Sequence, residues 1–168
     1  WDSLPEVEQS AIKARQGVAM PMMDLTTVVD SLGTQIPMDG ITQGEIIMRG
    51  NSVMKGYYKN PEATAKSFAG GFFHSEDIAV QHPGGMMQIA DRMKDIIISG
   101  GENIYPAELE RVLAGHPDLI EFAIIGRDDE RWGQVPMVVA VRVSSDVEAA
   151  HILDVFNGEV ARFKQPKD

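Results

Sequence analysis

Three short stretches of the chain combine residue types that could contact a ligand. In the first, Phe72-Phe73-His74-Ser75-Glu76-Asp77, a carboxylate follows two aromatic residues where a strand is expected to open. The Asp77 carboxylate there could accept two hydrogen bonds from a diol such as a ribose. An aspartate that only caps a turn is the alternative that these residues leave open.

The second stretch, Asp91-Arg92-Met93-Lys94-Asp95, places four charged residues among five. It lies where the pattern of the chain changes, so it suits either a solvated hinge or a plain charged connector. The Arg92 guanidinium offers a fork of donors that fits a ribose or a phosphate.

The third stretch, Ser99-Gly100-Gly101-Glu102-Asn103-Ile104-Tyr105-Pro106, has two glycines between an expected strand and an expected helix. Glycine allows positive φ and a close approach of backbone to a ligand. A turn that needs glycine for its geometry alone is equally compatible with this pair.

The elements around the first stretch indicate a β-rich region. A helix is expected over 5–15 with Ser3 as its N-cap, and another begins at Asn60-Pro61 and ends near Gly70-Gly71. Short apolar and β-branched runs predict strands at 25–29, 45–49, 78–80 and 86–90, the last two joined as a hairpin.

After Arg92 the pattern becomes strand, helix, strand, strand, helix, which predicts a small α+β domain. The strands are expected at 96–98, 122–125 and 135–143, and one helix runs from Pro106 to Gly115. A longer helix capped by Ser145-Asp146 would carry apolar residues at helical spacing, namely Ile152, Val155, Phe156, Val160 and Phe163. The boundary near 91–95 divides the chain into 1–91 and 92–168.

Composition excludes several classes of protein. The 168 residues contain no Cys, so disulfide scaffolds, thiolate metal sites and cysteine nucleophiles are ruled out, and a cytoplasmic location is expected. A formal net charge of −10 disfavours broad binding to nucleic acid or anionic membranes. No apolar run of 18 residues and no basic leader are found, so neither a membrane span nor a signal peptide is expected.

Generic catalytic motifs are absent as well. The sequence has no Walker A loop, HExxH, GxSxG or GxGxxG. The histidines are scattered without ligand spacing, so surface or turn roles are expected for all of them and no metal site is predicted; they are His74, His82, His116 and His151.

Taken in order, the three stretches resemble the adenylate-forming superfamily, and most closely the AMP-forming acyl-CoA synthetases of the fatty-acid type. Further segments continue the resemblance along essentially the whole chain: Gly44-Glu45-Ile46, Arg49-Gly50-Asn51, Gly56-Tyr57-Tyr58, His116-Pro117, Trp132-Gly133 and Phe163-Lys164-Gln165-Pro166-Lys167.

The resemblance implies that the chain is a C-terminal fragment of such an enzyme. Residues 1–91 would be the last β-rich, distorted-barrel part of the large AMP-binding domain, and 92–168 the small α+β lid domain, incomplete at its end. The family's phosphate loop and acyl pocket are not found in the chain, and its catalytic lysine would lie beyond Asp168. The fragment itself is therefore expected to be inactive and to hold no catalytic residue.

The implied reaction belongs to an acid–thiol ligase and has two steps. A carboxylic acid first attacks the α-phosphate of Mg2+-bound ATP to give an acyl-adenylate and pyrophosphate. The thiol of coenzyme A (CoA) then displaces AMP. A lid domain that rotates about a hinge would serve both steps in turn.

Site roles carry over to matching positions only. Asp77 would accept the ribose hydroxyls of ATP, with Arg92 as its partner. Lys94 matches the hinge. Gly100, Gly101 and Glu102 match the loop that lines the CoA channel. Trp132 and Lys164 are further candidates for CoA contacts, although Trp132 could equally serve lid packing.

One position departs from the family pattern, since Glu76 stands where the family usually has Gly. Its side chain would add a negative charge beside the nucleotide, which would either weaken ATP binding or demand a different backbone angle. Other readings remain open: an aryl-CoA ligase, a carrier-protein-loading adenylation domain, or a non-catalytic CoA- or nucleotide-binding descendant.

Overall fold

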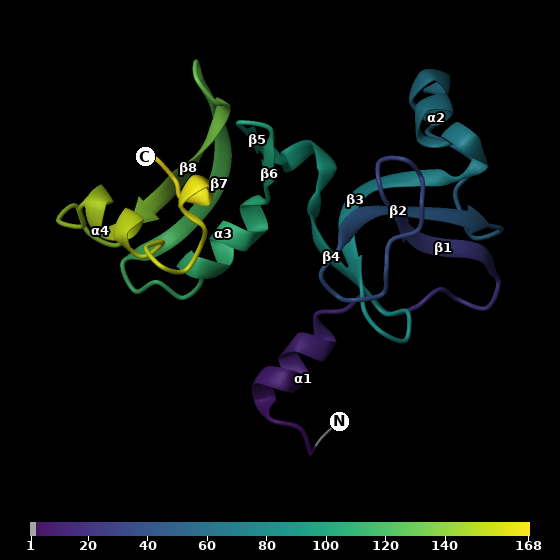
Figure 1. The fold of residues 1–168 in the computed structure, drawn as a ribbon, viewed down its shortest axis with the longest axis horizontal. Helices are drawn as coiled ribbons and strands as arrows, with labels where there is room; N and C mark the ends of the chain where they lie inside the picture. Colours follow the sequence, from purple (N-terminus) through teal and green to yellow (C-terminus); the bar gives the residue numbers. More distant parts are fainter. Residues whose placement is uncertain (1–2) are drawn as a thin grey trace. The chain divides into compact units, whose positions relative to one another are not determined.

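The computed structural model describes residues 3–168, which form two compact units, one ending at Met93 and the other starting at Lys94 (Figure 1). Both units combine an antiparallel sheet with a few short helices, so the predicted α+β class is confirmed. Within the described residues, no helix is long and apolar enough to cross a membrane.

A four-stranded antiparallel sheet forms the centre of the first unit. Its strands follow one another in chain order: β1 (Met23–Val29), β2 (Gln43–Gly50), β3 (Phe73–Gln81) and β4 (Met87–Arg92). The predicted strands and the hairpin between 78–80 and 86–90 are therefore confirmed, with longer bounds. One face of the sheet buries a cluster of Val28, Ile36, Ile46, Ala79 and Met87.

The helices of this unit show which local sequence signals were sufficient to predict where a helix begins. In α2 (Pro61–Ser67) the Asn60 side chain accepts the Ala63 N–H at 3.0 Å and Pro61 occupies the first turn, as predicted. A 3₁₀ turn, η1 (Ala69–Gly71), follows it. In α1 (Glu6–Lys13) the N-cap position belongs to Pro5, so the predicted N-cap at Ser3 is wrong. Acidic residues in its first turn and Lys13 in its last turn suit the helix dipole.

The outer edge of β4 is covered by the segment that follows α1. Gln16 N–H donates to the Met87 carbonyl at 2.8 Å, and Met87 N–H donates to the Gly17 carbonyl at 2.8 Å. The Gln16 side chain also accepts the Ile89 N–H at 2.6 Å. These contacts satisfy backbone groups that would otherwise be open to pairing with another chain.

The second unit contains a sheet with the order β6-β5-β8-β7. Its strands are β5 (Ile97–Ser99), β6 (Glu102–Ile104), β7 (Leu119–Asp129) and β8 (Gly133–Arg142). Helix α3 (Pro106–Leu113) buries Leu109 and Leu113 against this sheet, as its helical spacing predicted. Pro106 at its first position also matches the prediction.

The last predicted helix is much shorter than expected. Helix α4 covers only Ala149–Asp154, with Glu148 at its N-cap, so capping by Ser145-Asp146 is wrong. Gly158 has a φ of +86° and ends any continuation, and the chain resumes as a 3₁₀ turn, η3 (Arg162–Lys164). Ile152 and Phe156 still reach the core, whereas Phe163 is 48% exposed.

Candidate functional site

Asp77 and Arg92 face each other across two neighbouring strands. They are paired residues in the antiparallel ladder of β3 and β4, and Arg92 Nε lies 3.3 Å from Asp77 Oδ1. The Asp77 side chain is 23% exposed, whereas that of Arg92 is 63% exposed. The structure thus brings together the two residues predicted to share a ribose. Asp77 lies within β3 rather than at its opening, which corrects its expected place in the strand.

Ser75, the residue before Glu76, has a clear local role. Ser75 Oγ accepts the Asp77 N–H at 3.0 Å, which stabilises the backbone just ahead of the carboxylate. The Ser75 hydroxyl therefore acts on the backbone geometry at Asp77.

Glu76 adopts a conformation that favours glycine, with a φ of +60°. Its carboxylate is 3.1 Å from Lys66 Nζ on α2, in an ion pair whose side chains are 47% and 79% exposed. Glu76 therefore adopts a left-handed angle, which a residue with a side chain rarely takes.

The Gly100-Gly101 pair forms a two-residue hairpin turn. Ser99 pairs with Glu102, and the φ values of the two glycines are +60° and +88°. Positive φ at both central residues is the requirement of a type I′ turn, for which Gly-Gly is a recognised signal. The expectation of a direct strand-to-helix connection missed β6, which this signal could have revealed.

Trp132 packs directly over this turn. Gly100 N–H donates to the Trp132 carbonyl at 2.8 Å, and a Cβ at Gly100 would meet Trp132 Cε3 at 2.8 Å. A Cβ at Gly101, in contrast, would meet no atom within 4 Å. Gly100 therefore permits close packing of the indole, and Gly101 borders open space.

A pocket of about 160 Å³ lies beside the turn and gathers three of the predicted CoA-binding residues, Gly100, Glu102 and Trp132. Phe163 and Lys167 complete its lining, together with Ser99 and Val135. The indole remains 45% exposed. The sequence pointed to Lys167 only as the last residue of the stretch 163–167, and it did not predict that Lys167 lines this pocket.

A tight turn holds the backbone of Trp132. Asp129 Oδ1 accepts the N–H groups of Trp132 and Arg131, both at 2.9 Å. These backbone hydrogen bonds, that of Trp132 foremost, lower the pKa of the Asp129 carboxyl from its ordinary value. The Arg131 guanidinium lies 4.8 Å from the centre of the indole, a cation–π contact.

Lys164 is engaged elsewhere. Its Nζ donates to both carboxylate oxygens of Glu108, at 2.8 and 2.7 Å, and its side chain is only 22% exposed. Lys164 does not line the pocket at Trp132, and its contact with Glu108 ties η3 to α3.

Lys94 lies at the junction of the two units, within a 3₁₀ turn, η2 (Met93–Asp95). Its side chain is exposed. An exposed residue at this place in the chain is compatible with the predicted hinge, which remains a prediction.

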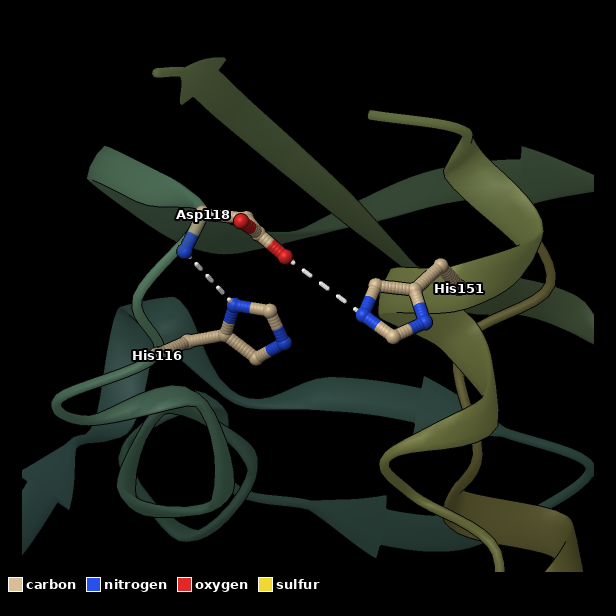
Figure 2. Close-up of side chains that lie close together, drawn as sticks. All are labelled: His116, Asp118 and His151. Carbon is tan, nitrogen blue, oxygen red and sulfur yellow. Dashed lines mark hydrogen bonds and ion pairs between the residues drawn. The ribbon is translucent and has the colours of Figure 1, made fainter. Parts of the chain in front are cut away.

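Two histidines that the sequence left scattered meet in the second unit. Figure 2 shows His116 and His151 on either side of Asp118, and the ligand atoms of the three lie within 4.8 Å of one another. Asp118 N–H donates to His116 Nδ1 at 3.2 Å, so the neutral ring of His116 carries its proton on Nε2 and offers no free lone pair. His151 Nε2 lies 3.4 Å from Asp118 Oδ2. These contacts tie α4 to the start of β7.

Together, the fold and these contacts describe a chain with two candidate ligand-binding places: a carboxylate–guanidinium pair on a four-stranded sheet, and a glycine hairpin with an exposed indole in a small α+β unit. Residues 108–168 match the family described as AMP-binding enzyme C-terminal domain.

Known relatives extend the match toward the N-terminus. An acetate–CoA ligase of Humulus lupulus is 54% identical over 137 residues, which are 81% of this chain and 24% of that protein. A peroxisomal acetate/butyrate–CoA ligase of Arabidopsis thaliana is 52% identical over 149 residues, 88% of this chain and 26% of its own length.

Two solved structures have the same fold as this chain. The o-succinylbenzoate CoA synthetase of Bacillus subtilis, bound to its acyl-adenylate intermediate, superposes with a TM-score of 0.81 at 31% identity, over 98% of this chain and 33% of that one. ATP-bound MatB from Rhodopseudomonas palustris gives a TM-score of 0.81 at 33% identity, over 92% and 31%. The chain belongs to the adenylate-forming superfamily, is similar to CoA ligases, and spans about a quarter to a third of the length of these relatives.

Proposed function

We propose that the protein containing this chain is an ATP-dependent acid–CoA ligase. In the first step a carboxylate oxygen of the acid bonds to the α-phosphorus of ATP, and the bond to pyrophosphate breaks. In the second step the CoA sulfur bonds to the acyl carbon and AMP leaves, while the thiol proton passes to solvent. The observation that carries the proposal is the Asp77–Arg92 pair, in a chain whose relatives are named CoA ligases.

Asp77 would bind the ribose of ATP and of AMP. An ionised carboxylate accepts two hydrogen bonds, which matches the two hydroxyls of a ribose. Arg92 contacts one Asp77 oxygen through Nε, so it would orient the carboxylate and offer its remaining donors to the nucleotide. Mg2+ would enter with the triphosphate, as part of the substrate.

The pocket at the glycine hairpin would receive CoA. The open space at Gly101 leaves room for a narrow pantetheine arm, and the exposed indole of Trp132 offers a flat surface to a nucleotide ring. Lys167, in the same pocket, offers a cation to a phosphate. Lys164 would have to leave Glu108 to do so, which makes it the weaker candidate.

Rotation of the second unit about Lys94 would let one protein perform both steps. The junction of the two compact units lies between Met93 and Lys94, and the exposed Lys94 can change its backbone angles without disturbing a core. The second unit would then act as the lid, and the first as part of the large AMP-binding domain.

The acid is proposed to be a fatty acid or another small apolar acid. The named relatives include ligases for acetate, butyrate and 2-methylpropanoate, and also for benzoate and cinnamate. A pyrophosphate-release assay of the full-length protein with a panel of alkyl and aryl acids would separate these classes. Turnover with short or medium alkyl acids supports the proposal, and a preference for aryl acids would contradict it.

The same assay separates two other activities. Acyl-adenylate formation followed by transfer to a carrier protein, with no transfer to CoA, would identify a carrier-loading domain. Binding of nucleotide without pyrophosphate release would identify a non-catalytic descendant. A cytoplasmic location is also proposed, but some relatives are named peroxisomal, so imaging of the tagged full-length protein is needed to test it.

A further inference from the structure

The strand that carries Asp77 contains a bulge immediately before it. Glu45 of β2 pairs with Ile78 of β3, and Ile47 pairs with His74, so two steps along β2 correspond to four steps along β3. The two extra residues interrupt the ladder, and Glu76 within the bulge has a φ of +60°. Bulges redirect side chains and occur frequently beside active sites.

Side chains satisfy the backbone donors of this bulge. Glu76 N–H donates to Glu45 Oε1 at 3.1 Å, and Asp77 N–H donates to Ser75 Oγ at 3.0 Å. Because the register shift removes regular ladder partners at these positions, loss of the Glu45 carboxylate would deprive the Glu76 N–H of its acceptor.

The second oxygen of Glu45 is fixed from the other side. His74 Nδ1 lies 2.7 Å from Glu45 Oε2, and an ionised carboxylate only accepts, so the histidine donates. The Glu45 side chain is 14% exposed and that of His74 is 33% exposed. A charge-assisted hydrogen bond in such a shielded place is stronger than the same contact in open water.

We propose that Glu45 is a positioning residue for Asp77. Its carboxylate, oriented by His74, holds the bulge whose shape sets the direction of the Asp77 side chain toward the ribose. Arg92 holds the same Asp77 carboxylate from β4, where the register shifts again between Ile78 and Ala79. Glu45 acts through the bulge and does not itself contact the nucleotide; this inference rests on the proposed function.

The test measures the KM for ATP in ATP–pyrophosphate exchange by the full-length protein. Glu45→Gln keeps the shape of the side chain but removes its charge, so the contacts with the Glu76 N–H and with His74 are no longer charge-assisted. We expect the KM for ATP to rise about tenfold, the order of the difference between a charged and a neutral hydrogen bond. The KM for CoA in thioester formation should stay the same, because the proposed CoA pocket belongs to the second unit and the bulge to the first.

A double variant distinguishes positioning from an independent effect. Glu45→Gln combined with Asp77→Ala should be no worse than Asp77→Ala alone, because the bulge acts only through Asp77. Additive losses would overturn the inference.

The histidine provides a second route should Glu45→Gln fold poorly. His74→Gln keeps an N–H donor and should retain nearly all ATP affinity, whereas His74→Leu should lose part of it. Lys66→Ala is the matched control, since it removes the exposed ion pair at Glu76 but neither bond of Glu45, and it should leave the KM for ATP unchanged.

The two possible failures are distinguishable. If the wild-type protein exchanges pyrophosphate and Asp77→Ala is impaired, but Glu45→Gln and His74→Leu behave as wild type, the inference alone is wrong. If none of the acids in the panel supports pyrophosphate exchange by the wild-type protein, the proposed function fails and the inference fails with it.

Discussion

The antiparallel pairing of β3 with β4 places Asp77 opposite Arg92, and this contact links two of the stretches that the sequence singled out separately. Each residue taken alone allowed a turn cap or a plain connector. Their pairing in the folded chain, with the Asp77 carboxylate largely shielded, favours a shared ligand-binding role.

Glu76 allows a test of backbone strain at this site. Its φ of +60° costs a residue with a Cβ about 1 kcal/mol, while its exposed pair with Lys66 contributes little. Glu76→Gly is expected to raise the free energy of unfolding by up to about 1 kcal/mol, and Glu76→Ala to leave it equal or lower. Urea denaturation of the chain measures both, and a glycine variant no more stable than the wild type would contradict the strain.

Gly100 and Gly101 form a matched pair of turn positions with different surroundings. Both have positive φ, but only at Gly100 would a Cβ collide with the Trp132 indole. Gly100→Ala should therefore lose about 1–3 kcal/mol of stability, more than Gly101→Ala, because strain and overpacking add. Thermal unfolding followed by tryptophan fluorescence compares the two, and equal losses would show that the contact with Trp132 is unimportant.

At the scale of the elements, strands and caps with strong local signals were predictable. Asn60-Pro61 and Pro106 begin helices where expected, and the β-branched runs form strands. Helix α4 was not predictable in its length, because the helical spacing of apolar residues continues past Gly158, whereas the helix already ends at Asp154 and Gly158 has a positive φ. Strand β6 was missed because a Gly-Gly hairpin was interpreted as a connection to a helix.

The candidate site was also predictable only in part, because some of its residues depend on how strands pair and not on a local pattern. Motif residues such as Asp77 and Gly100 carry a signal in their own types and spacing. Glu45 and His74 act through a bulge that changes the register between two strands, and no local pattern specifies such a shift.

The early end of α4 makes a prediction about its two aromatic neighbours. In the long helix first expected, Phe156 and Phe163 would share one buried face. Here Phe156 is fully buried and Phe163 is 48% exposed. Phe156→Ala should cost about 3–5 kcal/mol of unfolding free energy, and Phe163→Ala about 1 kcal/mol or less. Similar losses in chemical denaturation would contradict the observed end of the helix.

At the scale of the whole molecule, the two units would contribute to different half-reactions. The Asp77–Arg92 pair belongs to the first unit and the glycine hairpin to the second. If the second unit is a lid that rotates between the steps, a substitution at the hairpin should reduce thioester formation more than adenylation.

Gly101→Leu in the full-length protein tests this division. The side chain would enter the open space at the turn, so CoA-dependent thioester formation should fall at least about tenfold while ATP–pyrophosphate exchange changes less than about twofold. Gly115→Leu is the control, since this glycine also has positive φ and open space but is not part of the hairpin beside the pocket. Equal losses in both half-reactions of Gly101→Leu would contradict a CoA channel here.

The most direct test of the nucleotide-binding role of Asp77 is the KM for ATP of Asp77→Ala in ATP–pyrophosphate exchange by the full-length protein. Asp24→Ala is the control, because Asp24 also pairs with an arginine, Arg49, on the same sheet, but its side chain is 63% exposed. We predict that the KM for ATP rises at least about tenfold for Asp77→Ala, through the loss of hydrogen bonds to the ribose, and stays unchanged for Asp24→Ala. An unchanged KM for ATP in Asp77→Ala would contradict the role assigned to the Asp77–Arg92 pair.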